Sequence, residues 1–371
     1  MRIGIDAREL LDRPTGVGRY LAELLARWTR DDHAAAHELV LFTPSPLAGR
    51  RWAGSGGARV TETMVPGGAG TAWEQWRLAR AAAGAGLDVF FAPAYTAPLR
   101  LRVPVVLSVH DVSFAAHPEW FRWREGLRRR LLAKAAAGRA ATVLTLTAFS
   151  KRQVCEHLGV AAGKVRVIAP AVDAHPCFGD APGASGTGAR EPLVLYVGSI
   201  FTRRHVPDLI RGFARLARTH PSARLVIVGE NRTFPREDPA QVAAGSGVAG
   251  RVRLLDYLDD GALGALYARA SAFAFLSAYE GFGLTPLEAV RAGVPPVVLD
   301  TEVAREAYGD AAVYVAAGDE AGLAAALAAL LDDAALRARL REAGARTLAR
   351  YSWDRAARET LDALAGAART A

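Results

Sequence analysis

Two glutamates, Glu280 and Glu288, stand on either side of a short glycine-rich stretch in the last third of the chain. The run 271–277 just before it is short and apolar, which is typical of a buried parallel strand, and the glycines that follow suit neither a strand nor a helix. After them we predict a helix with Thr285 as its N-cap, Pro286 as its first residue and Glu288 in its first turn. Both carboxylates are therefore expected near a helix N-terminus at the end of a strand.

This arrangement is suited to holding an anion. A helix N-terminus at the carboxyl edge of a parallel sheet offers backbone N–H groups and a positive dipole end to a phosphate. Two carboxylates would repel that phosphate unless each faced a neutral neighbour, and sugar hydroxyls are such neighbours because they donate well to carboxylates. The stretch predicts a ligand with phosphate at its centre and hydroxyls at both ends, which is the layout of a nucleotide sugar. The alternative is a helix-capping acid and a solvated loop acid.

A second loop follows the apolar run 192–197; it begins at Gly198 and carries Arg203 and Arg204. Adjacent arginines at the carboxyl end of a strand repel each other. A bound diphosphate would relieve the repulsion, because guanidinium groups form forked pairs with phosphate oxygens. We expect this loop to meet the same ligand; the alternative is a pair of surface arginines that face solvent.

Near the start of the chain, Gly16 and Gly18 open a long amphipathic helix after the first predicted strand. They do not form the dinucleotide-binding fingerprint, since Leu21 stands where a third glycine is required and the turn after the strand is too long. Glycines at a helix start let a ligand approach the backbone closely. This loop either borders a ligand or is an ordinary flexible turn.

His110 and Asp111 end another predicted strand, which covers 103–111. Parallel sheets bind their ligands at the carboxyl edge, so His110 is a candidate for the same site. A polar pair that merely ends a strand is the plainer interpretation of these two residues.

The segment 118–138 predicts a basic helix that begins with aromatic residues. Its arginines and lysine outnumber its two glutamates, and Trp120, Phe121 and Trp123 lie at its start. Such a helix suits an anionic membrane surface; a solvated face over buried tryptophans is the alternative. Nucleic acid is not expected as a partner, because no recognisable nucleic-acid-binding motif accompanies the charge.

Strands and helices alternate through both halves of the chain, which predicts an α/β fold with two doubly wound parallel sheets. The length of 371 residues is enough for two domains. We place an N-terminal domain at 1–178, a linker rich in glycine, alanine and serine at 179–191, and a second domain at 192–348. Residues 349–371 are expected to form a final helix.

The composition indicates a cytoplasmic protein. The two cysteines, Cys155 and Cys177, have neither metal-type spacing nor a disulfide framework, which suits a reducing compartment. The first residues predict a strand and a charged turn rather than a secretion signal. No apolar run is long enough to span a membrane. The net charge is +8, and much of the excess lies in 118–138.

The stretch from Glu280 to Glu288 resembles the E-x(7)-E signature of retaining glycosyltransferases, specifically glycosyltransferase family 4, whose architecture is GT-B. The resemblance covers nearly the whole chain. It implies two Rossmann-like domains facing a cleft, with the helix 349–371 crossing back to the first domain. This chain departs from the family at two loops: Thr15 stands where a glycine is common, and Arg204 stands where a lysine is usual.

The resemblance also implies roles for the candidate catalytic residues. Glu280 would hold hydroxyls of the transferred sugar, and His110 would lie near that sugar. Arg203 and Arg204 would stabilise the leaving diphosphate, and Glu288 would accept hydrogen bonds from ribose. The other donor-binding candidates are loop positions, with Tyr257 near the nucleobase: Gly16, Gly18, Gly198, Tyr257, Gly281, Phe282, Gly283 and Leu284.

The implied activity is retaining transfer of a sugar from a nucleotide diphosphate sugar, with a GDP-mannose-type donor, to a hydroxyl acceptor. The acceptor would be a glycan or a lipid-linked glycan in surface polysaccharide synthesis, and a lipid-linked acceptor would place the protein peripherally on the inner membrane face. No metal and no other cofactor is expected, because arginines and a helix dipole can stabilise the leaving group.

Three rival classes are distinguishable. A nicotinamide dehydrogenase requires the glycine fingerprint that this chain lacks. A sugar phosphorylase requires a pyridoxal-phosphate lysine near the donor site, and no lysine occurs between Pro192 and Ala371. A non-catalytic nucleotide-sugar-binding or scaffolding protein is the third alternative, and only an activity measurement separates it from an enzyme.

Overall fold

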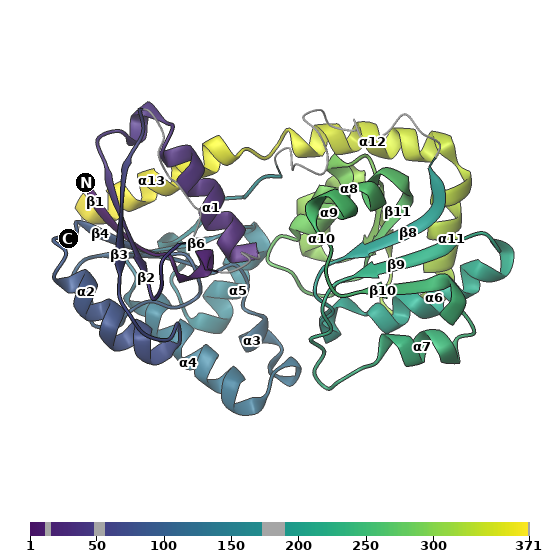
Figure 1. The fold of residues 1–371 in the computed structure, drawn as a ribbon, viewed down its shortest axis with the longest axis horizontal. Coiled ribbons are helices and arrows are strands. Elements are labelled where there is room, and N and C mark those ends of the chain that lie inside the picture. Colours follow the sequence, from purple (N-terminus) through teal and green to yellow (C-terminus); the bar gives the residue numbers. More distant parts are fainter. Residues whose placement is uncertain (12–15, 48–55, 173–189, 370–371) are drawn as a thin grey trace. The chain divides into compact units, whose positions relative to one another are not determined.

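The computed structural model describes residues 1–11, 16–47, 56–172 and 190–369, which form two compact units (Figure 1). Thr15, Cys177 and all but the last two residues of the predicted linker 179–191 lie outside the described residues.

Unit 1 and unit 2 are each built from more than one segment of the chain. Unit 1 comprises Met1–Pro118, Trp123–Pro170 and Ser352–Ala371. Unit 2 comprises Glu119–Arg122 and Ala171–Tyr351. The last segment of unit 1 is therefore separated from the rest of that unit by Ala171–Tyr351, the long segment of unit 2.

The sheet of unit 1 has seven strands, and every pair of neighbours is parallel. Its order is β3 (Arg59–Met64), β2 (Glu38–Thr43), β1 (Arg2–Asp6), β4 (Val89–Ala92), β5 (Val105–Ser108), β6 (Thr142–Thr145) and β7 (Val165–Val167). The central strands β4 and β5 are buried along their whole length, as expected for a sheet covered on both faces.

The α-helices of unit 1 are α1 (Gly16–Trp28), α2 (Ala79–Ala83), α3 (Ser113–Ala116), α4 (Trp123–Arg139), α5 (Ala148–Leu158) and α13 (Trp353–Arg369). A π-helix covers Trp73–Leu78, and short 3-10 turns lie at Arg8–Leu10, Asp32–Ala34 and Ala162–Lys164. A further 3-10 turn, Pro118–Trp120, spans the boundary with unit 2. The last helix, α13, packs against α1 (Figure 1). The buried Trp28 of α1 donates its indole N–H to the carbonyl of Ala357 at 2.9 Å. The end of the chain is thus part of the hydrophobic core of unit 1.

The sheet of unit 2 has six strands, again all parallel. Its order is β10 (Val252–Leu255), β9 (Arg224–Val228), β8 (Glu191–Val197), β11 (Ala270–Phe275), β12 (Pro296–Leu299) and β13 (Val313–Val315). Its helices are α6 (Val206–Thr219), α7 (Pro239–Gly245), α8 (Asp260–Arg269), α9 (Leu284–Arg291), α10 (Glu302–Tyr308), α11 (Glu320–Asp332) and α12 (Ala334–Leu348), with 3-10 turns at Thr202–Arg204, Ala249–Arg251 and Gly309–Ala311.

In both units the first strand lies inside the sheet, between the second and the fourth strand of that unit, and helices lie on both faces of the sheet. This confirms the predicted α/β fold with two Rossmann-like, doubly wound parallel sheets. Loops that follow neighbouring parallel strands meet at one edge of each sheet. The loops after β8 and β11 therefore lie together in unit 2, and the loops after β4 and β5 lie together in unit 1.

The start of α9 differs from the prediction. The helix begins at Leu284, with Gly283 in the cap position at φ +83° and no side-chain cap, so Thr285 is a helical residue and not the N-cap. Glu288 consequently lies in the second turn rather than the first. The physical reason is that a glycine in the left-handed conformation turns the chain into the helix without a capping oxygen. The helix ends at Arg291, and Gly293 just beyond it takes φ +72°, as is common after a helix C-terminus.

Candidate active site

The edge of unit 2 at which β8 and β11 end brings Arg204 and Glu280 into contact. Arg204 Nε lies 3.0 Å from Glu280 Oε1, and the two side chains are only 12% and 14% exposed. Ser277 donates its hydroxyl to the same carboxylate oxygen at 2.9 Å. Residues separated by a long stretch of sequence thus meet because their strands are neighbours in the sheet.

The Arg204 guanidinium is held on several sides. Its Nη1 donates to the carbonyl of Ser199 at 2.8 Å, and its plane lies over the ring of Phe275 at 4.8 Å. Burial by itself would lower the pKa of Arg204, but the neighbouring Glu280 carboxylate and the Tyr196 hydroxyl raise it above the ordinary value. The side chain therefore carries a permanent positive charge in a fixed orientation.

Arg203 is placed differently from its neighbour. Its guanidinium stacks on the ring of Phe201, with 4.5 Å between them. Its Nε is buried and makes no hydrogen bond to any part of the chain that the structure describes. Buried donors normally have partners, so this N–H is one of the few exceptions in the described part of the chain.

Glycines are required where the β8 and β9 loops touch. Gly198 has φ +138°, and a Cβ there would lie 2.7 Å from Arg204 Nη1. Gly229, after β9, has φ +151°, and its Cβ would lie 2.0 Å from the carbonyl oxygen of Gly198. The backbone of the β8 loop is therefore held close to both the arginine and the neighbouring loop.

The glycine-rich loop after β11 leads directly from Glu280 into α9. Gly281 and Phe282 are buried, while Gly283 and Leu284 are half-buried. Glu288 is 9% exposed and lies on α9, so it belongs to the same strand–loop–helix unit as Glu280. The structure thus places the whole predicted signature at one edge of the sheet.

Tyr257 follows β10, at the outer side of the same edge. It is 61% exposed, and β9 separates its strand from β8. An exposed aromatic ring at this place suits stacking on a base.

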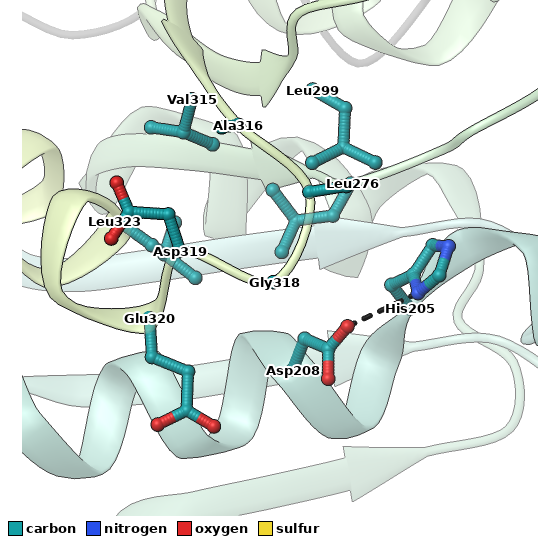
Figure 2. A pocket seen from close by; sticks show the side chains of 11 residues that line it. His205, Asp208, Leu276, Leu299, Val315, Ala316, Gly318, Asp319, Glu320 and Leu323 are labelled. Carbon is teal, nitrogen blue, oxygen red and sulfur yellow. Dashed lines mark hydrogen bonds and ion pairs between the residues drawn. The ribbon is translucent and has the colours of Figure 1, made fainter.

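A small cavity opens at this edge between the start of α6 and the loop 316–319 (Figure 2). His205 and Asp208 line it, with His205 Nδ1 3.1 Å from Asp208 Oδ2. Its volume of about 10 Å³ suits a single water molecule. It is therefore too small to be the binding site of a sugar nucleotide.

In unit 1, His110 lies just beyond the end of β5 and is 8% exposed. Its Nε2 is 2.7 Å from the carbonyl oxygen of Pro93, which can only accept, so Nε2 carries the proton and Nδ1 is left as an acceptor. Burial lowers the pKa of His110, which favours the neutral ring. Its ring is packed edge-on by Tyr20 at 4.9 Å and by Tyr95 at 5.7 Å.

Asp111 serves as an anchor for this cluster. Its Oδ1 accepts from the backbone N–H and the hydroxyl of Ser113, at 2.8 and 2.6 Å, and its Oδ2 accepts from the hydroxyl of Tyr95 at 3.2 Å.

Gly16 and Gly18 open α1, the helix that carries Tyr20; Gly16 is exposed and Gly18 is buried.

Sequence reasoning missed Tyr95, which has φ +58° although it is not a glycine. Such a conformation is strained and is often found at functional sites. The signal in the sequence was weak: a tyrosine two residues after a proline at a strand end.

It also missed a cluster of charged residues that supports the same loop. Arg8 pairs with Asp6 at 2.8 Å and with Glu74, and Glu74 accepts from the hydroxyl of Thr96 at 2.7 Å. Burial raises the pKa of Asp6 to about 6, against the opposing effect of Arg8.

Within the described ranges, no group of three or more His, Cys, Asp or Glu side chains could hold a metal ion.

The basic helix predicted over 118–138 corresponds to α4, which begins at Trp123; Pro118–Trp120 form a separate 3-10 turn, so Trp120 and Phe121 precede the helix. Trp123, Leu127 and Leu131 are 71%, 38% and 58% exposed, and they follow one another at intervals of four residues. Arg124 and Arg128 are exposed beside them. None of the described helices is both long and apolar enough to cross a bilayer.

Two family models match the chain, one described as Glycosyltransferase Family 4 over residues 14–175 and one as Glycosyl transferases group 1 over residues 181–347. With the two parallel sheets, they define the class: the chain belongs to the family 4 glycosyltransferases and has the GT-B fold. The resemblance carried by Glu280 and Glu288 is thereby confirmed at the level of the family.

Individual relatives share between a quarter and a third of their residues with this chain over the aligned parts. The chain is 32% identical to the glycogen synthase of Mycobacterium tuberculosis over 72% of its own length, and the match spans only 64% of that enzyme. It is 25% identical to the O-antigen chain mannosyltransferase B of Escherichia coli, over 74% of this chain and 73% of that protein. Among solved structures, Anabaena HepE in complex with UDP and glucose has a TM-score of 0.71 at 18% identity, covering 98% of this chain and 99% of HepE.

Proposed function

We propose that this glycosyltransferase moves a sugar from a nucleotide diphosphate sugar to a hydroxyl of a glycan or lipid-linked glycan, and that it retains the anomeric configuration. The observation that carries the proposal is the edge of unit 2. There the buried pair of Arg204 and Glu280 lies beside Arg203, whose Nε lacks a partner among the described residues. A diphosphate would satisfy that N–H, and sugar hydroxyls would satisfy the remaining acceptor capacity of Glu280.

Each residue at this edge then has a distinct task. Arg203 and Arg204, with backbone N–H groups of the loop 281–284, stabilise the negative charge that builds on the leaving diphosphate. Glu280 holds sugar hydroxyls in the orientation that Arg204 and Ser277 impose on it. These arginines supply permanent positive charge at the leaving group, which supports a reaction without a metal ion or another cofactor.

The remaining candidates extend the donor site outward from the diphosphate. Glu288 accepts from ribose hydroxyls, and Tyr257 faces the nucleobase. Gly198 keeps the β8 backbone close to the phosphates, and Gly16 and Gly18 let a ligand approach the start of α1.

Unit 1 supplies the acceptor side in this proposal. The Nδ1 lone pair of the neutral His110 ring accepts a hydrogen bond from a sugar hydroxyl without adding charge. With retention, the bond from the acceptor oxygen to the anomeric carbon forms on the face from which the bond to the phosphate oxygen breaks. The hydroxyl proton passes to that phosphate oxygen, so no protein base is needed for the transfer.

The stereochemistry can be tested directly by NMR of the first product formed from an α-linked donor. We expect an α-linked product, and a β-linked product would refute retention. The two glutamates and the two arginines would then have to be reassigned to an inverting reaction.

We propose a GDP-mannose-type donor, supported by the similarity to a mannosyltransferase of O-antigen synthesis. Thermal-shift screening against GDP-, UDP- and dTDP-sugars tests this, and stabilisation by a UDP-sugar alone would overturn it. HepE, which shares the fold, was crystallised with UDP and glucose, so the UDP-sugars are the pertinent comparison. A non-catalytic nucleotide-sugar-binding protein is the alternative; it would show stabilisation by a donor but neither transfer nor hydrolysis in the presence of acceptor pools.

We further propose that α4, within 118–138, contacts an anionic membrane surface and so places the protein on the inner membrane face. The exposed row of Trp123, Leu127 and Leu131 gives it an apolar stripe, and arginines border that stripe. An apolar stripe bordered by basic residues matches an interfacial helix.

Vesicle flotation tests this contact. The wild type is expected to float with vesicles that contain phosphatidylglycerol and to stay in solution with neutral phosphatidylcholine vesicles. The double variant Arg124→Glu/Arg128→Glu should lose flotation, whereas Arg339→Glu, which reverses an exposed charge on α12, should not. Equal flotation of all three proteins would overturn the proposal, and binding to duplex DNA in place of vesicles would favour nucleic acid.

A further inference from the structure

Tyr308, the last residue of α10, lies against the glycine-rich loop of the proposed donor site. It is 2% exposed, and its hydroxyl shares one proton between the carbonyl oxygens of Gly283, at 3.1 Å, and Phe282, at 3.4 Å. Burial raises the pKa of Tyr308 well above its ordinary value, so the hydroxyl keeps that proton. The loop backbone therefore has a fixed partner on one side.

This contact determines which way the peptide groups of the loop point. In a trans peptide the carbonyl of one residue and the N–H of the next point in opposite directions. Because the carbonyls of Phe282 and Gly283 face Tyr308, the N–H groups of Gly283 and Leu284 face away from it. These are two of the N–H groups expected to meet the diphosphate.

Gly283 shows how closely the tyrosine approaches. A Cβ at this position would lie 2.0 Å from Tyr308 Oη, and the residue has φ +83°. No side chain fits between the loop backbone and the phenol. The glycine is thus required both for its conformation and for the contact with Tyr308.

A second tyrosine holds the side chain of the same loop. The Phe282 ring packs edge-on against Tyr351, with 5.0 Å between ring centroids. The hydroxyl of Tyr351 donates to the carbonyl of Ala307 at 2.9 Å, next to Tyr308 in the chain. The loop is therefore held by its carbonyls and by its phenylalanine, and both contacts converge on the end of α10.

We propose that Tyr308 is a positioning residue for donor binding: by holding the carbonyls of Phe282 and Gly283, it directs the N–H groups of Gly283 and Leu284 towards the diphosphate. This rests on the proposed function, because it takes the loop 281–284 as the diphosphate site. Tyr308 itself contacts no substrate in this proposal. A purely structural Tyr308 would affect thermal stability without affecting donor affinity.

The chain offers a matched control in Tyr314. Its hydroxyl donates to the carbonyl of Gly309 at 2.6 Å and lies 3.3 Å from the carbonyl oxygen of Ala304. Like Tyr308, it is a tyrosine whose hydroxyl bonds to backbone carbonyls, but these carbonyls belong to α10 and the residue after it and not to the donor loop. The test compares Tyr308→Phe with Tyr314→Phe by calorimetric titration with GDP, UDP and dTDP and by steady-state kinetics.

We expect Tyr308→Phe to weaken binding of the nucleoside diphosphate by about tenfold, because a hydrogen bond that orients two donors is lost. The donor KM should rise with it while the acceptor KM stays unchanged. Tyr314→Phe should lower the melting temperature without changing either KM. Equal donor affinity in wild type and Tyr308→Phe would overturn the proposal and leave the proposed function standing. Failure of the wild type to bind any of the three diphosphates would overturn the proposed function, and the role of Tyr308 with it.

The double variant Gly283→Ala/Tyr308→Phe keeps the proposal testable if Gly283→Ala by itself binds no nucleoside diphosphate. Removing the phenol oxygen takes away the atom nearest to the new Cβ, so Gly283→Ala should impair donor binding less in the Tyr308→Phe background than in wild type. Some loss should persist, since alanine is disfavoured at this φ. Strictly additive effects of the two substitutions would contradict the contact on which the proposal depends.

Discussion

The carboxyl edge of the sheet in unit 2 carries a buried ion pair, Arg204 with Glu280, whereas the same edge in unit 1 presents the neutral ring of His110 between Tyr20 and Tyr95. Permanent charge suits the side that must stabilise a departing diphosphate. The neutral, aromatic surroundings of the His110 ring suit a hydroxyl acceptor, which gains no charge before the transfer. The two sheets have the same architecture, so the difference lies in the loops.

The two edges also hold their backbones by different means. In unit 2, Gly198, Gly229 and Gly283 take positive φ values and let loops approach one another with no side chain between them. In unit 1, Tyr95 takes a positive φ without being a glycine, and Asp111 and its neighbours hold it there. The left-handed conformation costs a non-glycine residue about 1–2 kcal/mol. Each edge carries one such residue, Tyr95 in unit 1 and His205, directly after Arg204, in unit 2 at φ +47°. The two edges therefore differ in the close approach of glycine loops, which is found in unit 2.

Arg204→Ala should have the largest effect, because it breaks the charged edge. It leaves Glu280 buried without its partner, so we expect a loss of about 3 kcal/mol in the free energy of unfolding. It also removes positive charge from the leaving group, so kcat should fall by about 10²–10³-fold. Urea unfolding and steady-state kinetics measure the two losses separately.

Glu280→Gln in the Arg204→Ala background serves as the control. It removes the unpaired carboxylate, so stability should recover in part while activity stays low. Full transfer rates in both Arg204→Ala and Glu280→Gln would show that the charged edge of unit 2 is not the donor site.

Gly229→Ala sharpens the comparison of how the backbones are held. Its new Cβ would lie 2.0 Å from the carbonyl oxygen of Gly198, so the β8 and β9 loops must separate. We expect a loss of about 2 kcal/mol in the free energy of unfolding and a weaker donor affinity, since the loop beside Arg204 moves. Gly245→Ala on α7 meets no atom within 4 Å and should change neither quantity. If the two variants behave alike, close packing of the β8 and β9 loops is not what shapes this edge.

Much of this comparison could be predicted from sequence. Apolar runs alternating with helices predict the parallel sheets, and polar residues directly after such runs must lie at the carboxyl edge. For that reason Arg204 and Glu280, which follow two predicted strands of the same sheet, could be expected to lie near one another. The adjacency of β8 and β11 then brings them into contact.

The residues that hold these loops could not be predicted in the same way. Tyr308 and Glu74 act through tertiary contacts with segments distant in sequence, which no local pattern reveals. The helix start at Leu284 was misplaced because Thr285 and Pro286 satisfy the rules for a side-chain cap. Those rules do not anticipate a glycine held in the left-handed conformation against a tyrosine.

Tyr95→Gly tests the strained residue of unit 1. Glycine adopts φ +58° freely, so this variant should be more stable than Tyr95→Ala by about 1 kcal/mol. Both should lower kcat, by up to about 10²-fold, because the ring that packs against His110 is gone and the proposed acceptor-side histidine is misplaced. Tyr95→Phe keeps the ring and should retain most of the activity. Wild-type kcat in Tyr95→Gly would show that the strain serves only the fold.

Asp6→Asn probes the charges that support the edge of unit 1. The pKa of Asp6 is raised to about 6 in the folded state, above an unfolded value of about 3.9. The folded state therefore binds the proton more tightly. The contribution of Asp6 to stability is complete below about pH 3.9 and is lost as the pH rises through about 6. Urea unfolding between pH 4 and pH 7 should show the free energy of wild type falling by about 1–2 kcal/mol relative to Asp6→Asn. A flat difference between wild type and Asp6→Asn would mean that Arg8 and its neighbours compensate the buried carboxylate fully, and the edge of unit 1 would then be as firmly charged as that of unit 2.

Asp300 gives the opposite sign of pH dependence, since its hydrogen bonds from Arg305 lower the pKa of its carboxyl. The contribution of Asp300 to stability is present at neutral pH and lost on acidification, so wild type should lose stability relative to Asp300→Asn below about pH 4.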